Sequence, residues 1–187
     1  MWLGVVAALL AGRAAAGGGV MLDNDRCVIT IGFYEAHFTA YQPGTRGDEA
    51  FCEDLPEVGE SVFVLDYLHE AMSRVPVDFR IIRDPTGLGR FVRGEDLEGL
   101  DLEAHTVYYH PPVVEADASF RVSHDFAEAG RYVGIVTAGH PSKRETYTSV
   151  FPFAVGGGGL PWLWMLAGAA VAGCAAVLAL LLVRGAR

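Results

Sequence analysis

The feature that most constrains the fold is an uncharged apolar segment of 24 residues near the end of the chain, Leu160–Val183. At about 1.5 Å per residue, a helix of this length reaches about 36 Å, which is enough to cross the hydrocarbon core of a bilayer with some tilt. Two tryptophans lie near its outer end, and two arginines follow its inner end. Because positive charge beside a span marks the cytoplasmic side, residues 184–187 are expected to form a cytoplasmic tail.

A second apolar segment at the start of the chain predicts export. Residues 1–16 contain a short apolar run followed by Ala14 and Ala16, which are small residues of the kind that signal peptidase recognises. The run is too short to span a bilayer, so a cleaved signal peptide is favoured over an uncleaved N-terminal anchor. One Lys against thirteen Arg suggests a GC-rich bacterial genome. We therefore expect a single-pass protein of the bacterial inner membrane, with its ectodomain in the periplasm.

The charge of the middle of the chain excludes a role in binding nucleic acid. All 23 acidic residues and 11 of the 14 basic residues lie within residues 17–159, so the formal charge of this region is −12. Proteins that bind nucleic acid neutralise phosphates with Lys and Arg, which such a region cannot do. The two apolar ends raise the hydrophobic content of the whole chain to 51%, and this distribution also excludes a cytosolic enzyme and a transporter with many spans.

Two of the three cysteines, Cys27 and Cys52, lie in the exported region, whereas Cys174 lies inside the predicted span. In an oxidising compartment, two exported cysteines most simply form a disulfide. Such a bond would close a loop of about 25 residues, for which chain entropy predicts about 3.5 kcal/mol of stabilisation. Two free thiols, or a pair that holds a metal ion, are the alternatives.

The exported region is rich in short segments that favour strands. β-branched and aromatic residues recur with partial alternation, and Gly and Pro separate the segments. In Val75–Ile82, the residues Val75, Val77, Phe79 and Ile81 are expected to face one way. Strands are predicted at 27–33, 36–41, 61–68, 75–82, 105–110, 119–124, 131–137 and 147–155. About eight short strands without a helix of full length indicate an all-β fold, an antiparallel β-sandwich over residues 17–155.

The remaining parts of the exported region are expected to be irregular. Residues 42–60 are predicted to form a long loop that contains Cys52. Residues 84–104, which are rich in Gly and acidic side chains, are predicted to form a solvated insertion with room for a turn of helix. Pro111 and Pro112 are expected to end the strand before them. Residues 156–159 are all glycine and predict a hinge between the sandwich and the membrane helix.

The segment Phe126–Gly134 contains Gly130 and Tyr132 in a pattern that resembles the Asp-x-Gly-x-Tyr-x-Cys stretch of immunoglobulin-like domains. Gly134 stands where that stretch has its Cys, and residues 17–159 contain no Trp. The chain thus resembles the broader immunoglobulin-like sandwiches, including the small membrane-anchored bacterial domains of the YtkA and FixH type. This resemblance implies an immunoglobulin-like sandwich in which Tyr132 makes the corner hydrogen bond. It also implies an association with systems that handle copper.

The chain has no recognisable catalytic motif, and we expect no enzymatic activity. Its six histidines have no tight ligand spacing. His69 and Met72 are the best candidates for a metal site, since imidazole and thioether ligands three residues apart suit copper. Scattered surface or hydrogen-bonded histidines are the favoured interpretation, so no metal or other cofactor is assigned.

The predicted membrane helix carries small residues at a spacing of four, where a tether would need only length and apolarity. These residues are Gly168, Ala169, Ala172, Gly173 and Ala176. Small residues at this spacing let helix backbones approach closely in lipid, although the composition of a GC-rich genome offers another explanation. The sequence therefore predicts an accessory or structural subunit that packs against other transmembrane subunits of a larger membrane complex. The alternative is a copper-handling accessory protein for a membrane oxidase or monooxygenase.

Overall fold

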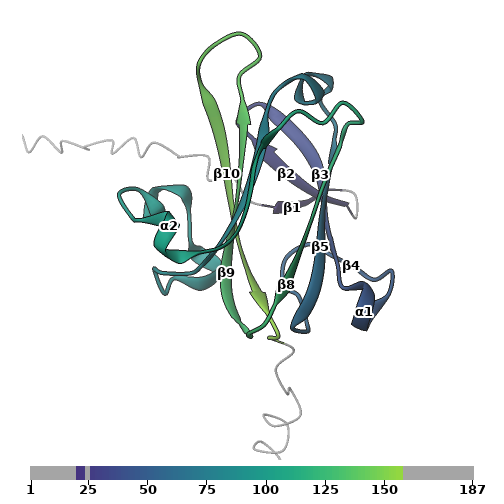
Figure 1. Cartoon of the computed structure of the whole chain (residues 1–187), viewed down its shortest axis with the longest axis vertical. Helices are drawn as coiled ribbons and strands as arrows, with labels where there is room; N and C mark the ends of the chain where they lie inside the picture. Colours follow the sequence, from purple (N-terminus) through teal and green to yellow (C-terminus); the bar gives the residue numbers. More distant parts are fainter. Residues whose placement is uncertain (1–19, 24–25, 158–187) are drawn as a thin grey trace, which may run out of the picture.

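A computed structural model of the chain describes residues 20–23 and 26–157, and these form two antiparallel β-sheets packed face to face (Figure 1). The sandwich predicted from the sequence is confirmed. The predicted signal peptide, the last residues of the predicted glycine hinge, the predicted membrane span and the predicted cytoplasmic tail lie outside the described residues. Within those residues, no helix is both long enough and apolar enough to cross a bilayer.

The first sheet has six strands in the order β1-β2-β3-β5-β8, and β4 pairs with the end of β3 on the same side as β2, beyond the residues that β2 contacts. Every pair in this sheet is antiparallel. The strands are β1 (Val20–Asp23), β2 (Arg26–Ile31), β3 (Tyr34–Tyr41), β4 (Ala50–Phe51), β5 (Gly59–Tyr67) and β8 (Ser119–Phe126). The short helix α1 (Pro43–Arg46) lies between β3 and β4.

The second sheet has four strands in the order β10-β9-β6-β7. Its strands are β6 (Val77–Arg83), β7 (Thr106–Val113), β9 (Gly130–Gly139) and β10 (Thr146–Val155). The 3-10 helix η1 (Glu70–Arg74) connects β5 to β6, so the chain crosses from one sheet to the other there. The edge strands β7 and β10 of this sheet, together with β8 and β1 of the first sheet, bound the two open edges of the sandwich.

The core lies between the inner faces of the sheets and is rich in phenylalanine. Val77, Phe79 and Ile81 alternate along β6 and are 0% exposed, as the sequence pattern predicts. Phe63 of β5 reaches across to Phe79, with ring centroids 5.4 Å apart. Stacking of this kind adds to the stabilisation from burial of apolar area, so the two sheets are tied together at their centre.

A glycine in β9 makes room for one of these rings. Gly134 lies opposite Phe151, and a Cβ on Gly134 would lie 2.1 Å from Phe151 Cζ. The Phe151 ring therefore covers the glycine backbone, in the space that a larger side chain would need. This contact explains why a glycine stands at position 134.

Residues 84–105 differ from the solvated insertion that the sequence predicts. They contain η2 (Gly89–Phe91), η3 (Gly94–Leu97) and α2 (Leu102–His105). Val92 and Leu97 are buried on the outer face of the second sheet, in a small second core with Ile82, Val133, Ile135 and Val150. The acidic side chains remain at the surface, while widely spaced apolar residues attach the segment to the sheet.

Two further predictions need correction. Strand β7 continues through Pro111 and Pro112 instead of ending before them, because it is an edge strand and its register against β6 shifts there. Proline lacks an amide hydrogen and is tolerated at such edges and bulges. Residues 42–60 are also more regular than a loop, since they include α1, β4 and the start of β5.

Candidate functional site

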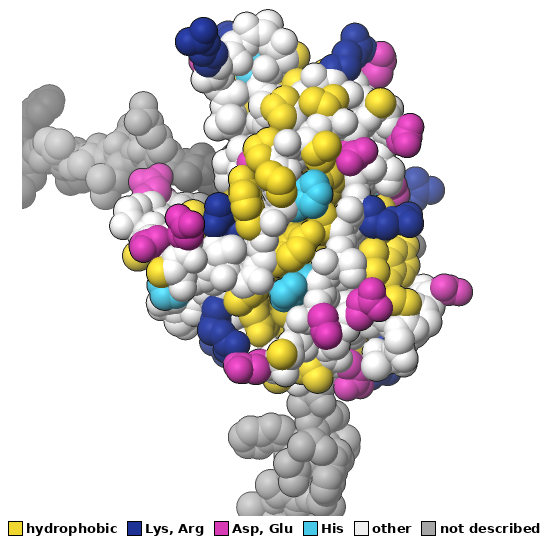
Figure 2. Space-filling view, viewed as in Figure 1, with side chains coloured by type: hydrophobic (Ala, Val, Ile, Leu, Met, Phe, Trp, Pro, Cys, Tyr) yellow, Lys and Arg dark blue, Asp and Glu magenta, His cyan; other side chains and the backbone are white. Residues whose placement is uncertain are grey.

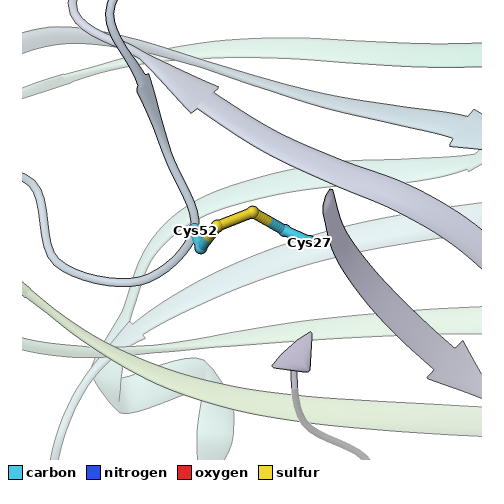
Figure 3. The surroundings of a disulfide bond; sticks show 2 residues. All are labelled: Cys27 and Cys52. Atoms are coloured by element: carbon cyan, nitrogen blue, oxygen red, sulfur yellow. A yellow bond between two sulfur atoms is a disulfide. The ribbon is translucent and has the colours of Figure 1, made fainter. Parts of the chain in front are cut away.

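The predicted disulfide is confirmed: Cys27 of β2 is bonded to Cys52, which directly follows β4 (Figure 3). The two Cα atoms are 5.6 Å apart, and both residues are half-buried. Just beyond Cys52, the amide of Leu55 donates to the carbonyl of Ala154, at the end of β10. The disulfide and this hydrogen bond fix residues 52–55 across the open edge between β1 and β10.

An open groove of about 660 Å³ lies beside the disulfide. Five separate parts of the chain form it: the start of β1, the residues after β4, the turn around η2, the start of β9 and the second half of β10. Its lining residues are Val20, Cys52–Asp54, Leu88–Arg93, Arg131 and Val150–Ala154. The groove therefore depends on contacts between residues more than 100 positions apart.

The turn that forms one wall of the groove is held by Asp84. Its carboxylate accepts hydrogen bonds from the amides of Thr86 (2.8 Å), Gly87 (3.2 Å) and Gly89 (3.0 Å). Burial alone would raise the pKa of Asp84, but these hydrogen bonds outweigh it and lower the pKa below its ordinary value. Gly89 has φ +60° and lies under the guanidinium of Arg131, so a Cβ there would be 2.8 Å from Arg131 Nη1.

Three exposed arginines line this groove: Arg90, Arg93 and Arg131. Among the described residues, none of the three forms an ion pair, whereas Arg46 and Arg83 do. The groove also contains two acidic residues, Glu53 and Asp54. Asp54 Oδ1 already accepts a hydrogen bond from the amide of Ala154, at 2.8 Å. The groove is thus a local concentration of positive charge on an acidic domain.

The structure does not present His69 and Met72 together at the surface. His69 caps the start of η1, and its Nδ1 accepts a hydrogen bond from the amide of Ala71 at 3.2 Å. Met72 is 0% exposed and belongs to the main core. Spacing along the chain suggested a shared side of a turn, but η1 directs the thioether inward because the core needs an apolar side chain there.

The other histidines are distributed over several elements: His37 in β3, His105 in α2, His110 in β7, His124 in β8 and His140 after β9. Within the described residues, no three His, Cys, Asp or Glu side chains are grouped so that they could hold a metal ion.

His110 and His124 belong to the edge strands β7 and β8, at the open edge opposite the disulfide. His124 packs on Phe126 at 4.6 Å between ring centroids and on Tyr108 at 5.3 Å. Burial lowers the pKa of His124, although the nearby Asp125 opposes this shift. Figure 2 shows a strip of hydrophobic side chains with histidines among them along the middle of the domain. The lowered pKa favours the neutral imidazole of His124, which packs against the two aromatic rings.

Tyr132 is 3% exposed, and its hydroxyl donates to the carbonyl of Glu128 at 2.8 Å, four residues upstream. Gly130 opens β9 between these two residues, directly opposite Val155. The Arg83 side chain lies over the Tyr132 ring and also pairs with the Glu128 carboxylate at 2.7 Å. This geometry is the one that a corner tyrosine requires, and it joins β9 to the β8–β9 turn.

The five small residues of the predicted helix, Gly168 to Ala176, lie outside the described residues. The groove itself was not predicted from the sequence. Its only signals there are the basic stretch around residues 90–93 and the position of Cys52, and neither indicates that β10 lies beside both.

Comparison with known proteins finds a similarity among solved structures. No family model and no curated protein matches the chain. Among solved structures, the chain is similar to the soluble domain of PmoD from Methylocystis sp. ATCC 49242 (Rockwell), with a TM-score of 0.58 and 28% sequence identity. The match covers 72% of this chain and 100% of that domain. It supports a small β-sandwich domain and does not single out the YtkA and FixH type.

Proposed function

We propose that the protein is a non-enzymatic accessory subunit of a larger membrane complex, anchored in the bacterial inner membrane with its β-sandwich in the periplasm. The observation that carries this proposal is the likeness to the PmoD soluble domain. The whole of that domain corresponds to only 72% of this chain. The chain therefore has sequence beyond such a domain, and its two apolar ends have the lengths of a signal peptide and a membrane span.

We also assign the sandwich to the broad immunoglobulin-like class. Buried Tyr132, with its hydroxyl bonded to the carbonyl of Glu128, supports this assignment. The titratable groups whose pKa values are shifted support a structural role for the domain. Asp84 holds a turn through backbone amides, and His124 packs against aromatic rings. Asp84 and His124 lie on separate elements, and each stabilises the fold locally.

The test of subunit function uses the full-length protein extracted from its own membranes in a mild detergent. On a native gel it is expected to migrate with a complex much larger than one chain. Gly168→Leu and Gly173→Leu should release it from that complex, because a large side chain prevents close approach of helices. Leu180→Ile is the matched control and should leave migration unchanged. Co-migration of both glycine variants with the complex would contradict helix packing by these residues.

Copper handling for a membrane oxidase or monooxygenase is the second candidate function, and the position of the disulfide favours it. The Cys27 and Cys52 sulfurs are adjacent and half-buried, and Cys52 lines the open groove. Exchange with an external dithiol, which is itself oxidised to a disulfide, would convert the Cys27–Cys52 bond into two thiols. As thiolates, the two cysteines are the soft ligands that Cu(I) prefers. Cys27 and Cys52 therefore fit copper only when the disulfide between them is reduced. A copper ion held there would be available to a partner enzyme.

Copper binding is tested by titrating Cu(I) into the reduced full-length protein without oxygen, against a chromogenic competitor. We expect binding that Cys27→Ser and Cys52→Ser each abolish. His69→Gln serves as the control, because the structure separates His69 from Met72, and it should leave the affinity unchanged. Equal affinity of the parent and both cysteine variants would exclude this site, and loss of binding in His69→Gln would restore the histidine as a ligand.

A further inference from the structure

The turn formed by residues 88–93 combines two features that rarely occur together on an acidic domain. Phe91 is 75% exposed and Leu88 is 46% exposed, so two large apolar side chains stand in solvent within one short turn. Arg90 and Arg93 flank Phe91. Exposed apolar residues alone are common on protein surfaces. Apolar and basic side chains side by side are typical of segments that lie in the interface of an anionic bilayer.

The turn is rigid, so its side chains are held in the exposed positions. Asp84 fixes its start through the amides of Thr86, Gly87 and Gly89. Directly after Phe91, the side chain of Val92 is buried in the second core and fixes the end of the turn. Because both ends are anchored, Phe91 cannot fold back onto the protein without losing these contacts.

The charges around the turn favour an anionic partner. Arg90, Arg93 and Arg131 form no ion pair with the described residues. Of the two acidic residues in the groove, Asp54 is hydrogen-bonded to the amide of Ala154. Acidic residues of η3 follow, where Asp96 accepts from the amide of Arg93. Three arginines against two acidic residues give the groove a net positive charge, whereas the exported region as a whole is acidic, so an anionic surface would favour this face.

The groove also lies where the chain leaves the domain. Arg131 is directly opposite Ala154, one residue before the end of β10 at Val155. The predicted membrane span begins at Leu160, six residues after Ala154. An extended chain covers at most about 3.5 Å per residue, so the groove lies within about 21 Å of the start of the span. That distance brings the turn within reach of the lipid headgroups.

We propose that residues 88–93 dock on the surface of the same bilayer that anchors the chain. Phe91 and Leu88 enter the interface between headgroups and acyl chains, and the three arginines bind the phosphates of anionic phospholipids. This inference rests on the membrane anchoring of the proposed function. Docking would hold the sandwich in one orientation above the membrane, despite the glycine hinge, and turn the β7–β8 edge away from the groove and toward other proteins.

The test places a photoreactive residue in the full-length protein, by Phe91→p-benzoylphenylalanine, after reconstitution into lipid nanodiscs. The discs contain either phosphatidylcholine alone or phosphatidylcholine with phosphatidylglycerol. Irradiation is expected to give a lipid adduct, seen by intact mass, mainly in the anionic discs. Phe33→p-benzoylphenylalanine is the matched control. Phe33 is 47% exposed but packs on Tyr147 at the start of β10, at the opposite end of the strand from the groove.

Charge variants test the role of the arginines. Arg90→Gln with Arg93→Gln should reduce the adduct at position 91 at least about fivefold, the effect expected for even one basic side chain at an anionic surface. Arg144→Gln, in the loop before β10, should leave it unchanged. Equal adduct yields at positions 91 and 33, or no response to the double variant, would overturn the proposal. In native membranes, an adduct to a protein subunit instead of lipid would also overturn it and assign the turn to a protein contact.

Anchoring is measured separately, by resistance of the protein to extraction at alkaline pH. Extraction of the parent protein would refute the membrane anchor of the proposed function. A protein that resists extraction but gives no lipid adduct at position 91 would refute only the docking of the turn.

Discussion

The contact between Gly134 and Phe151 provides a sharp test of the core. A Cβ at position 134 would lie 2.1 to 2.6 Å from three atoms of the Phe151 ring, much closer than carbon atoms approach. Phe151 is 2% exposed and packs on Phe38 with ring centroids 4.7 Å apart, so the ring cannot swing away freely. Gly134→Ala should therefore lower the free energy of unfolding by about 3 kcal/mol, the upper part of the range for overpacked cores.

A double-mutant cycle shows whether this ring is the cause. Phe151→Leu alone should reduce stability by about 1.5 kcal/mol, since it keeps an apolar side chain of similar size. If the clash with the ring explains the effect of Gly134→Ala, the double variant should lose about 2 kcal/mol less than the two single effects together, within the range seen for residues in contact. Gly94→Ala is the control, because its Cβ would meet only Val150, at 3.8 Å.

The assay is urea denaturation of residues 17–159, followed by circular dichroism, since this region has no tryptophan. A stability of Gly134→Ala equal to that of the parent would refute the close packing of Phe151 on β9. Strict additivity of the two substitutions would show that some other neighbour opposes the added methyl group. Gly94→Ala should lie within about 0.5 kcal/mol of the parent.

Three further predictions follow from single contacts. Cys27→Ser should lower stability by about 2–4 kcal/mol, and free Cys27 and Cys52 in a peptide map of protein isolated without reductant would reject the pairing. Tyr132→Phe should lower stability by about 1 kcal/mol and Tyr132→Ala by about 3–5 kcal/mol, and an Ala variant as stable as the parent would contradict the corner role. Burial lowers the pKa of His124 in the folded state, so the unfolded chain binds its proton more readily and stability should fall as the pH drops below about 6.5. His124→Gln should flatten the pH dependence of stability between about pH 7 and pH 5, and an unchanged slope would assign it to other groups.

The parts of the fold that depend on local patterns were predictable from the sequence. Alternation in β6 placed Val77, Phe79 and Ile81 on the inner face, because a strand directs successive side chains to opposite faces. The disulfide was predictable because the export expected from the sequence leaves Cys27 and Cys52 as the pair in an oxidising compartment. Both inferences need no knowledge of which strands are neighbours.

The predictions that the structure corrects concern segments whose conformation depends on tertiary contacts. Two successive prolines would end a central strand, but β7, which contains Pro111 and Pro112, is an edge strand. The order of strands in a sheet cannot be derived from that segment alone. Residues 84–104 are acidic in composition, so the sequence did not predict that Val92 and Leu97 attach the segment to the second sheet. The groove was not predictable because its walls come from five separate parts of the chain. The pair His69 and Met72 failed to form a common surface because Met72 faces the core.

The most direct test of the accessory-subunit role is to identify what the full-length protein binds in its own membrane. An affinity tag at the C-terminus, extraction in mild detergent and mass spectrometry of the purified material give the composition of any complex. We expect other integral membrane subunits to co-purify with the parent protein in fixed stoichiometry, and we expect the Gly168→Leu and Gly173→Leu variants to purify without them. Recovery of the parent protein alone, as a stable species in the same detergent, would contradict an accessory subunit.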